Sequence, residues 1–299
     1  MAFYFPDAPD LPLPPGHRFP ATKYRLLRER CAVEGLFARA GLLASPAVSQ
    51  GDLRRAHQGA YVRSVLSGTL SEEAMRRIGI PWSEILVARS LATVGGSLAA
   101  AHDALRDGIA GQLAGGTHHA HRDFGSGFCV FNDLAVAALA LVSSGCVRCV
   151  SILDCDVHQG DGTAAILQGI DAVQTISLHG EKNFPFRKFA SDLDIALPDG
   201  TGDLEYLVAL ETALAAVESF KPDILFYLSG ADALGADRLG RLALTCQGLA
   251  LRDTTVFKFA RSRRLPISIA VGGGYAEPIS ITVDAYLATF RAARTVYGF

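Results

Sequence analysis

The chain has 299 residues, of which 49% are hydrophobic, and it carries a formal net charge of -2 at pH 7. A chain of this length can bury a large core in one α/β domain or in two small ones, and because we find no linker that divides it, we predict a single domain over residues 1–299. The near-neutral charge and a pI near 6.4 give no electrostatic reason to expect nucleic acid or an anionic membrane surface as the main partner, and they favour a small or neutral substrate.

The apolar runs and the cysteines of the chain are used to predict its cellular compartment. No apolar run approaches the length that spans a bilayer, and the proline-rich segment 1–20 lacks the basic and apolar regions of a signal peptide. The six cysteines are interpreted as reduced thiols, with Cys146 and Cys149 forming a lone, structural CxxC pair. We therefore predict a cytoplasmic protein with no membrane partner, and the sequence leaves its oligomeric state open.

The first third of the chain is predicted to be mostly helical. It opens with a short strand, Ala2–Phe5, and periodic apolar positions then indicate three helices. These helices are expected over Tyr24–Ala40, Leu53–Leu66 and Ser83–Arg106.

From Ile109 onward the pattern predicts strands and helices in turn. The strands are expected at Gln112–Ala114, Val147–Leu153, Ala172–Leu178, Ile224–Leu228 and Ile267–Val271. The helices are expected at Asn132–Val142, Gly162–Gln168, Asp203–Ser219, Leu249–Arg261 and Ile279–Tyr297. Because these strands are continuously apolar rather than alternating, they are predicted to be buried on both faces, as in a parallel sheet covered by helices. The predicted fold class is an α/β sandwich.

Unusual polar residues follow four of the strands, each just past the carboxyl end. These clusters are Gly115–His119, Asp154–Asp161, Ser229–Asp232 and Gly272–Tyr275. Open parallel sheets bind their ligands at this edge, so we expect the four loops to converge on one site.

The second of these clusters indicates a metal site. Alternate residues of an extended chain share a face, so Asp154, Asp156 and His158 are expected to point the same way, and carboxylates with an imidazole suit zinc. A catalytic zinc usually keeps three protein ligands, and Asp232 is the candidate for the third beside Asp156 and His158. The alternative is an acidic turn in which Asp161 caps the next helix, and Asp232 has a similar alternative as a cap.

The first cluster offers a base and the last offers an oxyanion donor. We predict that His118 or His119 takes a proton from water and passes it to a leaving amine, with Asp154 orienting His118 and Asp161 orienting His119. Tyr275 is placed by three glycines and is predicted to donate a hydrogen bond to a polarised carbonyl oxygen. Paired histidines also occur as ordinary core or surface residues, and a Gly-Gly-Gly-Tyr turn also occurs as a tight crossing with a packed aromatic. The nearby His121 is expected to be exposed.

Together these segments resemble a known family. GGTHHAHRDFGSGFCVFND, ILDCDVHQGDG, ISLHG, LSGADALGADRLGRLALT and VGGGY, in this order, are similar to the zinc-dependent histone deacetylases and to their bacterial relatives, the acetoin utilisation proteins and acetylpolyamine amidohydrolases. The match covers roughly Gly115 to Tyr275, and the segment HRFPATKY resembles the class IV-like branch. The fold implied is the arginase/deacetylase-type three-layer sandwich with an eight-stranded parallel sheet.

The resemblance also implies roles for individual residues. It assigns Asp156, His158 and Asp232 to one catalytic Zn²⁺, with Fe²⁺ as the other metal considered, and His118, His119, Tyr275, Asp154 and Asp161 to catalysis. It further implies a structural potassium ion at Asp154, Ser177 and Leu178, and a substrate tunnel lined by Gly127, Phe128, Phe184 and Leu239.

The expected function is removal of an acyl group, most plausibly acetyl, from the side-chain amine of lysine or from a similar acylated amine. Alternatives are an acetylpolyamine or long-chain acyl-lysine deacylase, a binuclear manganese ureohydrolase, and a non-enzymatic acyl-ligand sensor or corepressor module. The ureohydrolase needs extra carboxylates that are lacking around Asp232, and a silent binder would be expected to lose Tyr275 or the histidines. Relatives that act on histone-like peptides carry an aspartate at the tunnel rim, whereas Gly79–Trp82 has no carboxylate, and Glu84 is a weak substitute.

Overall fold

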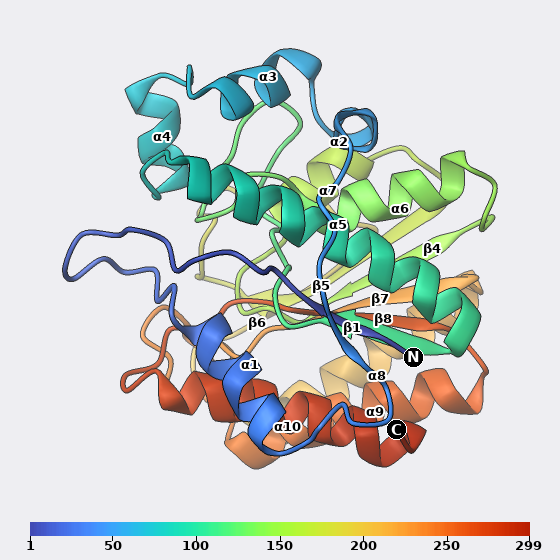
Figure 1. Ribbon diagram of the computed structural model, residues 1–299. Coiled ribbons are helices and arrows are strands. Elements are labelled where there is room, and N and C mark those ends of the chain that lie inside the picture. The colour runs from blue at the N-terminus through green and yellow to red at the C-terminus, as the bar shows by residue number, and fades with distance from the viewer.

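A parallel sheet of eight strands forms the middle layer of the protein in the computed structural model, which describes residues 1–299 (Figure 1). The strands are β1 (Phe3–Phe5), β2 (Leu42–Ala44), β3 (Ile109–Gln112), β4 (Val150–Asp154), β5 (Val173–Gly180), β6 (Leu193–Leu197), β7 (Ile224–Ser229) and β8 (Ile267–Val271). Their order across the sheet is β2-β1-β3-β8-β7-β4-β5-β6. The prediction of a parallel α/β sheet is therefore confirmed.

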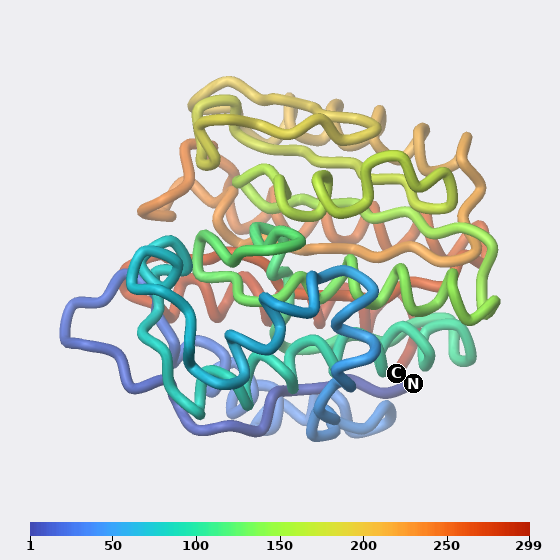
Figure 2. Tube along the Cα trace, turned by 90° about the horizontal axis from the view of Figure 1, so that it is seen from above, coloured from blue at the N-terminus to red at the C-terminus, as the bar shows by residue number.

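Helices cover both faces of this sheet, as Figure 1 shows. One face carries α1 (Lys23–Val33), α8 (Asp203–Phe220), α9 (Cys246–Ser262) and α10 (Ser280–Tyr297). The other carries α2 (Gln50–Ala56), α3 (Gly59–Ser67), α4 (Glu72–Ile78), α5 (Glu84–Asp107), α6 (Asp133–Ser143) and α7 (Asp161–Leu167). The N- and C-termini lie side by side in both views, and the rings of Phe3 and Phe299 are 5.0 Å apart (Figure 2).

Strand β7 explains why the central strands lack polar alternation. Leu225 and Tyr227 point into the core beneath α8, α9 and α10, whereas Ile224, Phe226 and Leu228 point into the core on the opposite face. Successive side chains of a strand face opposite sides, so a strand covered on both sides must be apolar at every position.

Several predicted boundaries are wrong, and the physical reasons are local. Helix α1 ends at Val33 rather than Ala40, because Gly35 adopts a positive φ of +56° and turns the chain toward β2. The helix predicted over Leu53–Leu66 is two helices, because His57 is extended between them with φ -117° and ψ 148°. The strand predicted at Gln112–Ala114 lies earlier, at β3. Helix α4 and strands β2 and β6 were not predicted.

Helix α5 corrects the expectation about apolar runs. It has 24 residues and is long and apolar enough to cross a membrane by length and composition alone. Half of its most apolar window is buried, and the helix packs against β3, β8 and α6. A core helix of an α/β sandwich has the same composition.

Candidate metal centre and active site

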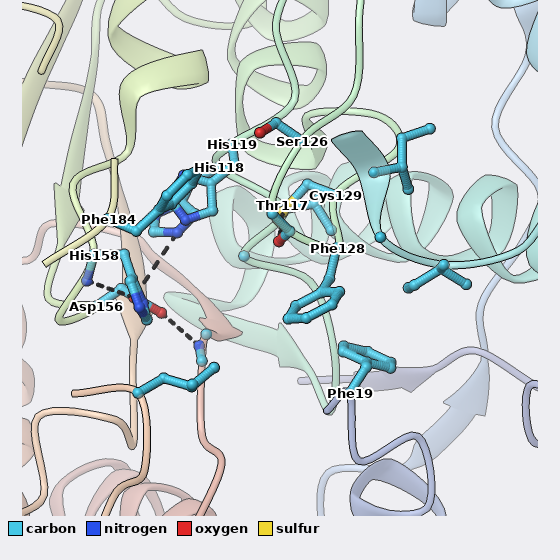
Figure 3. A pocket seen from close by; sticks show the side chains of 18 of the residues that line it. Phe19, Thr117, His118, His119, Ser126, Phe128, Cys129, Asp156, His158 and Phe184 are labelled. Carbon is cyan, nitrogen blue, oxygen red and sulfur yellow. Dashed lines mark hydrogen bonds and ion pairs between the residues drawn. The ribbon is translucent and has the colours of Figure 1, made fainter. Parts of the chain in front are cut away.

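Strands β3, β8, β7 and β4 are neighbours in the sheet, and their carboxyl ends form one edge. The four polar clusters predicted from the sequence follow these strands and meet there. A cavity of about 870 Å³ lies at this edge and is lined by residues of three of the clusters, among them His118, His119, Asp156, His158 and Tyr275. Figure 3 shows the histidines and Asp156 gathered at one side of this cavity, across from Phe128.

Two carboxylates and one imidazole converge at the floor of the cavity. The Nδ1 atom of His158 lies 2.9 Å from Oδ1 of Asp156 and 3.1 Å from Oδ2 of Asp232, and one ligand atom from each residue lies within 4.8 Å of the others. Asp232 is wholly buried and Asp156 nearly so. This donor set fits a borderline divalent cation such as zinc, with the cavity side left for water or substrate.

The backbone reaches this arrangement differently from the prediction. Strand β4 ends at Asp154, and the chain then bends, because Oδ1 of Asp154 accepts the Asp156 N–H at 3.0 Å and Oδ1 of Asp156 accepts the His158 N–H at 2.9 Å. The three residues therefore do not share one face of an extended strand. Asp154 turns toward His118, whereas Asp156 and His158 turn toward Asp232.

Glycine is required beside the carboxylates. A Cβ atom on Gly273 would lie 1.8 Å from Oδ2 of Asp232, and the Gly273 N–H donates to Oδ2 of Asp156 at 2.5 Å. On the other side, Oδ1 of Asp232 accepts the Val157 N–H at 3.0 Å. Backbone groups therefore fix both carboxylates, and any side chain at position 273 would displace one of them.

Each histidine of the pair is held by its own carboxylate. The Nδ1 atom of His118 lies 2.6 Å from Oδ2 of Asp154, and that of His119 lies 2.6 Å from Oδ1 of Asp161. An Nδ1–H donated to a carboxylate leaves Nε2 of each ring for other partners. The second oxygen of Asp161 lies 2.9 Å from Nε2 of His121, which is buried, so the expectation that His121 is exposed is wrong.

The electrostatic environment separates the two histidines. Burial disfavours the charged form of His118, but the charges of Asp154 and Asp156 outweigh this effect and raise its pKa to about 9. Burial and the neighbouring charge of His118 lower the pKa of His119 to about 4. Two groups whose pKa values are driven apart in this way suit different proton-transfer roles.

Tyr275 stands at the edge of the same cavity. Burial and the charges of Asp156 and Asp232 raise the pKa of Tyr275 well above its ordinary value, which keeps the phenol protonated as a donor. Its backbone N–H donates to Oδ2 of Asp237 at 2.6 Å, and Oδ1 of Asp237 accepts the N–H groups of Leu239 and Gly240. Asp237, not Asp232, therefore caps this loop.

Two further residues at this site were not assigned a role from the sequence. Asp237 fixes the backbone of Tyr275 by accepting its N–H. Lys23 is buried and donates to the Gly274 carbonyl and the Tyr286 hydroxyl, both at 3.1 Å. Asp237 is 38 residues from Tyr275, and Lys23 is 251 and 263 residues from its two partners, so sequence spacing gave no signal for these contacts.

Comparison with known proteins decides the family. The model of the histone deacetylase domain matches residues 17–290. The chain belongs to the histone deacetylase family. Membership implies a hydrolase acting on amides, and it confirms the resemblance found in the sequence; placement in the class IV-like branch stays a prediction.

Relatives and a solved structure agree with this membership. An uncharacterised protein of Picosynechococcus sp. is 42% identical over 295 residues, covering 98% of both chains. Histone deacetylase 2 of Arabidopsis thaliana is 34% identical over 187 residues, or 61% of this chain and 48% of that protein. Histone deacetylase 1 of Homo sapiens is 29% identical over 284 residues, or 87% of this chain and 58% of that protein. The chain thus spans about half the length of these two named deacetylases.

The HD domain of HDA15 has the same fold, with a TM-score of 0.81 at 22% identity over 99% of this chain and 88% of that domain. This likeness confirms the predicted arginase/deacetylase-type three-layer sandwich.

The residues that the histone deacetylase resemblance assigned to the tunnel line the cavity. Gly127, Phe128, Phe184 and Leu239 all border it. The ring of Phe184 stands edge-on to His119 at 4.9 Å, and a Cβ on Gly127 would lie 2.6 Å from the same imidazole. Phe128 has a φ of +67°, which a bulky residue seldom adopts, so its ring is held in the cavity at a cost in backbone strain.

Two other residue sets remain predictions within this histone deacetylase domain. Asp154 and Ser177 stand opposite each other where β4 pairs with β5, and Leu178 follows, which is compatible with the predicted potassium site without showing an ion. At the rim, Glu84 is exposed at the start of α5 and does not line the cavity, whereas Gly79 and Ile80 do. The rim therefore has no carboxylate at the predicted place.

Proposed function

We propose that the protein is a zinc-dependent amidohydrolase that removes an acyl group from the side-chain amine of lysine or from a similar acylated amine. The observation that carries this proposal is the convergence of a three-ligand metal centre, an ion-paired histidine pair and the tyrosine on one cavity. We further propose a cytoplasmic location.

The donor set of Asp156, His158 and Asp232 supports zinc as the metal. Burial and the charge of Asp156 raise the pKa of Asp232, which shows how unfavourable two bare carboxylates are at this depth. A bound zinc ion would supply the positive charge that these carboxylates lack and would act as a Lewis acid on the acyl carbonyl and on water. The chain's own residues perform the proton transfers.

His119 is proposed as the base and the later acid. Its low pKa leaves the ring neutral at pH 7, with Nδ1–H donated to Asp161 and the Nε2 lone pair available to accept a proton from water. The resulting imidazolium is stabilised by Asp161 and then protonates the leaving amine. His118 is held by Asp154 through Nδ1 and is placed to stabilise negative charge that develops beside it.

Tyr275 completes the site as the oxyanion donor. Because its phenol stays protonated, its hydroxyl can donate to the acyl oxygen as that oxygen gains negative charge. The aromatic walls, Phe128 and Phe184, suit the aliphatic stem of an acylated lysine entering between them. The absence of a rim carboxylate favours substrates that need no grip on an extended peptide backbone.

The test compares two variants with matched controls on an acetyl-lysine substrate. Tyr275→Phe and His119→Ala are expected to lower kcat/KM by at least about 100-fold while the zinc content per chain stays unchanged. Tyr297→Phe and His102→Ala remove the same groups away from the cavity and are expected to keep full activity. Turnover at the wild-type rate in either active-site variant would refute the proposal.

A further inference from the structure

A buried guanidinium lines the cavity on the side of helix α5. Arg89 is 9% exposed, and its Cζ lies 4.5 Å from the centroid of the Tyr24 ring. Burial lowers its pKa, and this effect outweighs the opposing influence of Tyr24 and Asp10. The guanidinium makes no hydrogen bond or ion pair with the protein. A guanidinium cannot shed its charge at accessible pH, so an unpaired one at this depth is costly unless an anion joins it.

A second cation lies in the same part of the cavity as Arg89, and no acid is paired with Arg89. Lys23 is also buried, and its ammonium group donates only to the Gly274 carbonyl and the Tyr286 hydroxyl. Asp10, whose charge acts on Arg89, pairs with Arg25 at 2.9 Å. The charge of Lys23 acts on Asp237, whereas no acid pairs with Arg89, so Arg89 is the cation of this region that lacks a partner.

At the outer rim of the cavity, by contrast, most arginines have acid partners. The exposed pairs are Arg76 with Glu72 at 3.3 Å, Arg238 with Glu277 at 2.7 Å and Arg241 with Asp199 at 3.1 Å. Arg18 has no acid partner, but it is exposed, so water screens its charge. Exposed pairs of this kind contribute little binding energy. The cationic group with the greatest capacity to bind an anion is the buried one.

Contacts connect Arg89 to the reacting centre. The Lys23 ammonium lies 4.9 Å from the centroid of the Tyr275 ring and 5.0 Å from that of the Tyr24 ring. The guanidinium of Arg89 in turn packs over the Tyr24 ring. We call the part of the cavity lined by Tyr24, Arg89, Thr93 and Ala114–Thr117 the inner chamber. Under the proposed function, an acylated amine that enters between Phe128 and Phe184 would direct its amine stem outward, and its acyl chain would extend toward the inner chamber.

We propose that the inner chamber is a carboxylate site, in which Arg89 binds the terminal carboxylate of a dicarboxylic acyl group such as succinyl or glutaryl. This inference rests on the proposed function and names its substrate class. The reaction is unchanged: water adds to the amide carbonyl, the C–N bond breaks, the amine takes the proton, and a dicarboxylate leaves. A released monocarboxylate such as acetate presents the same carboxylate group to Arg89. The experiment distinguishes binding of the acyl group's terminal carboxylate from binding of such a released product.

The kinetic test uses one lysine peptide carrying either a glutaryl or a valeryl group, which have five carbons each and differ in the terminal carboxylate. Wild-type kcat/KM is expected to favour glutaryl, and Arg89→Met is expected to lower the glutaryl value by at least about 30-fold while leaving valeryl within threefold. Arg89→Lys retains a cation and is expected to keep part of the preference. Arg63→Met, an exposed site outside the cavity, is expected to change neither value.

A binding measurement provides an independent readout. Calorimetry is expected to show glutarate binding to the wild-type protein and not to Arg89→Met, each checked for an intact fold by its melting temperature. A wild-type preference for valeryl, an equal loss on both substrates in Arg89→Met, or Arg89-dependent binding of acetate but not glutarate would overturn the proposal. Failure of every acyl-lysine to react would instead refute the proposed function, and the calorimetry would still decide whether the inner chamber binds carboxylates.

Discussion

At the scale of single residues, Asp237 connects the metal loop to Tyr275. It accepts three backbone N–H groups, from Tyr275 at 2.6 Å, Leu239 at 2.8 Å and Gly240 at 2.9 Å. Asp237→Asn replaces one acceptor oxygen by a donor, so we expect the tyrosine to shift and kcat to fall about tenfold, with KM nearly unchanged. Steady-state kinetics check this, with Asp171→Asn in an exposed turn as the control. A change confined to KM or to stability would contradict a positioning role.

His57 controls a pH dependence of stability rather than of catalysis. Its Nδ1 lies 2.9 Å from the His121 carbonyl and its Nε2 accepts the Asn132 N–H, so the ring is neutral, and burial lowers its pKa from 6.5 to about 4. The unfolded chain therefore binds a proton between pH 6.5 and 4 that the folded chain does not, and stability falls as the pH falls through this window. The contribution of His57 is about 3 kcal/mol at most.

Urea unfolding at pH 7 and pH 4.5 measures this contribution. The drop in the free energy of unfolding between the two pH values is expected to be smaller by about 2 to 3 kcal/mol in His57→Gln than in the wild-type chain. His102→Gln removes an exposed histidine and is expected to keep the wild-type drop. An identical drop in both variants would exclude His57 as the source.

At the scale of elements, helix α5 depends on a close approach to the chain after β2. A Cβ on Gly95 would lie 1.9 Å from the Pro46 carbonyl oxygen and 2.8 Å from the Val48 nitrogen, and both are backbone atoms that cannot rotate away. Gly95→Ala is therefore expected to destabilise the fold by at least about 2 kcal/mol, despite the better helix propensity of alanine. Gly51→Ala, in α2 where a Cβ would meet only Ser49 Oγ at an ordinary contact distance of 3.5 Å, is expected to stabilise by about 0.5 to 1 kcal/mol. Equal effects of the two substitutions in denaturant titrations would contradict this account.

The elements also show what the sequence can and cannot predict. Central strands such as β4 and β7 are buried on both faces, and burial on both faces makes them continuously apolar and easy to find. The edge strand β6, Leu193–Leu197, is only partly buried, and β2 has three residues, so neither leaves a clear pattern. The break at His57 is fixed by contacts to residues 64 and 75 positions away, which local periodicity cannot reveal.

The same distinction holds for the site. Asp156 and His158 directly follow a predictable strand, so their meeting with Asp232 could be expected from the topology of a parallel sheet. Arg89 lies within a helix, and only its place in the cavity, where its guanidinium has no acid partner, points to a binding role. Neither apolar periodicity nor a loop motif indicates that position.

At the scale of the whole molecule, the metal centre joins loops from two adjacent central strands, β4 and β7, and the glycine turn after β8 packs against both carboxylates. The prediction of a single domain over residues 1–299 then implies one cooperative unfolding transition, since two core clusters share the same sheet. A ligand bound at this junction is expected to stabilise the entire fold and not one lobe.

Zinc titration tests this coupling. Free zinc at 100 times its dissociation constant is expected to raise the free energy of unfolding by about 2.7 kcal/mol, and EDTA is expected to reverse the shift. Because protons compete for the same ligands, the shift is expected to shrink as the pH is lowered from 7 to 5. Asp232→Asn weakens one of the three ligands and is expected to abolish most of the shift, whereas Asp171→Asn retains it. Calorimetric melting that shows two transitions, with zinc moving only one of them, would contradict both the coupling and the single domain.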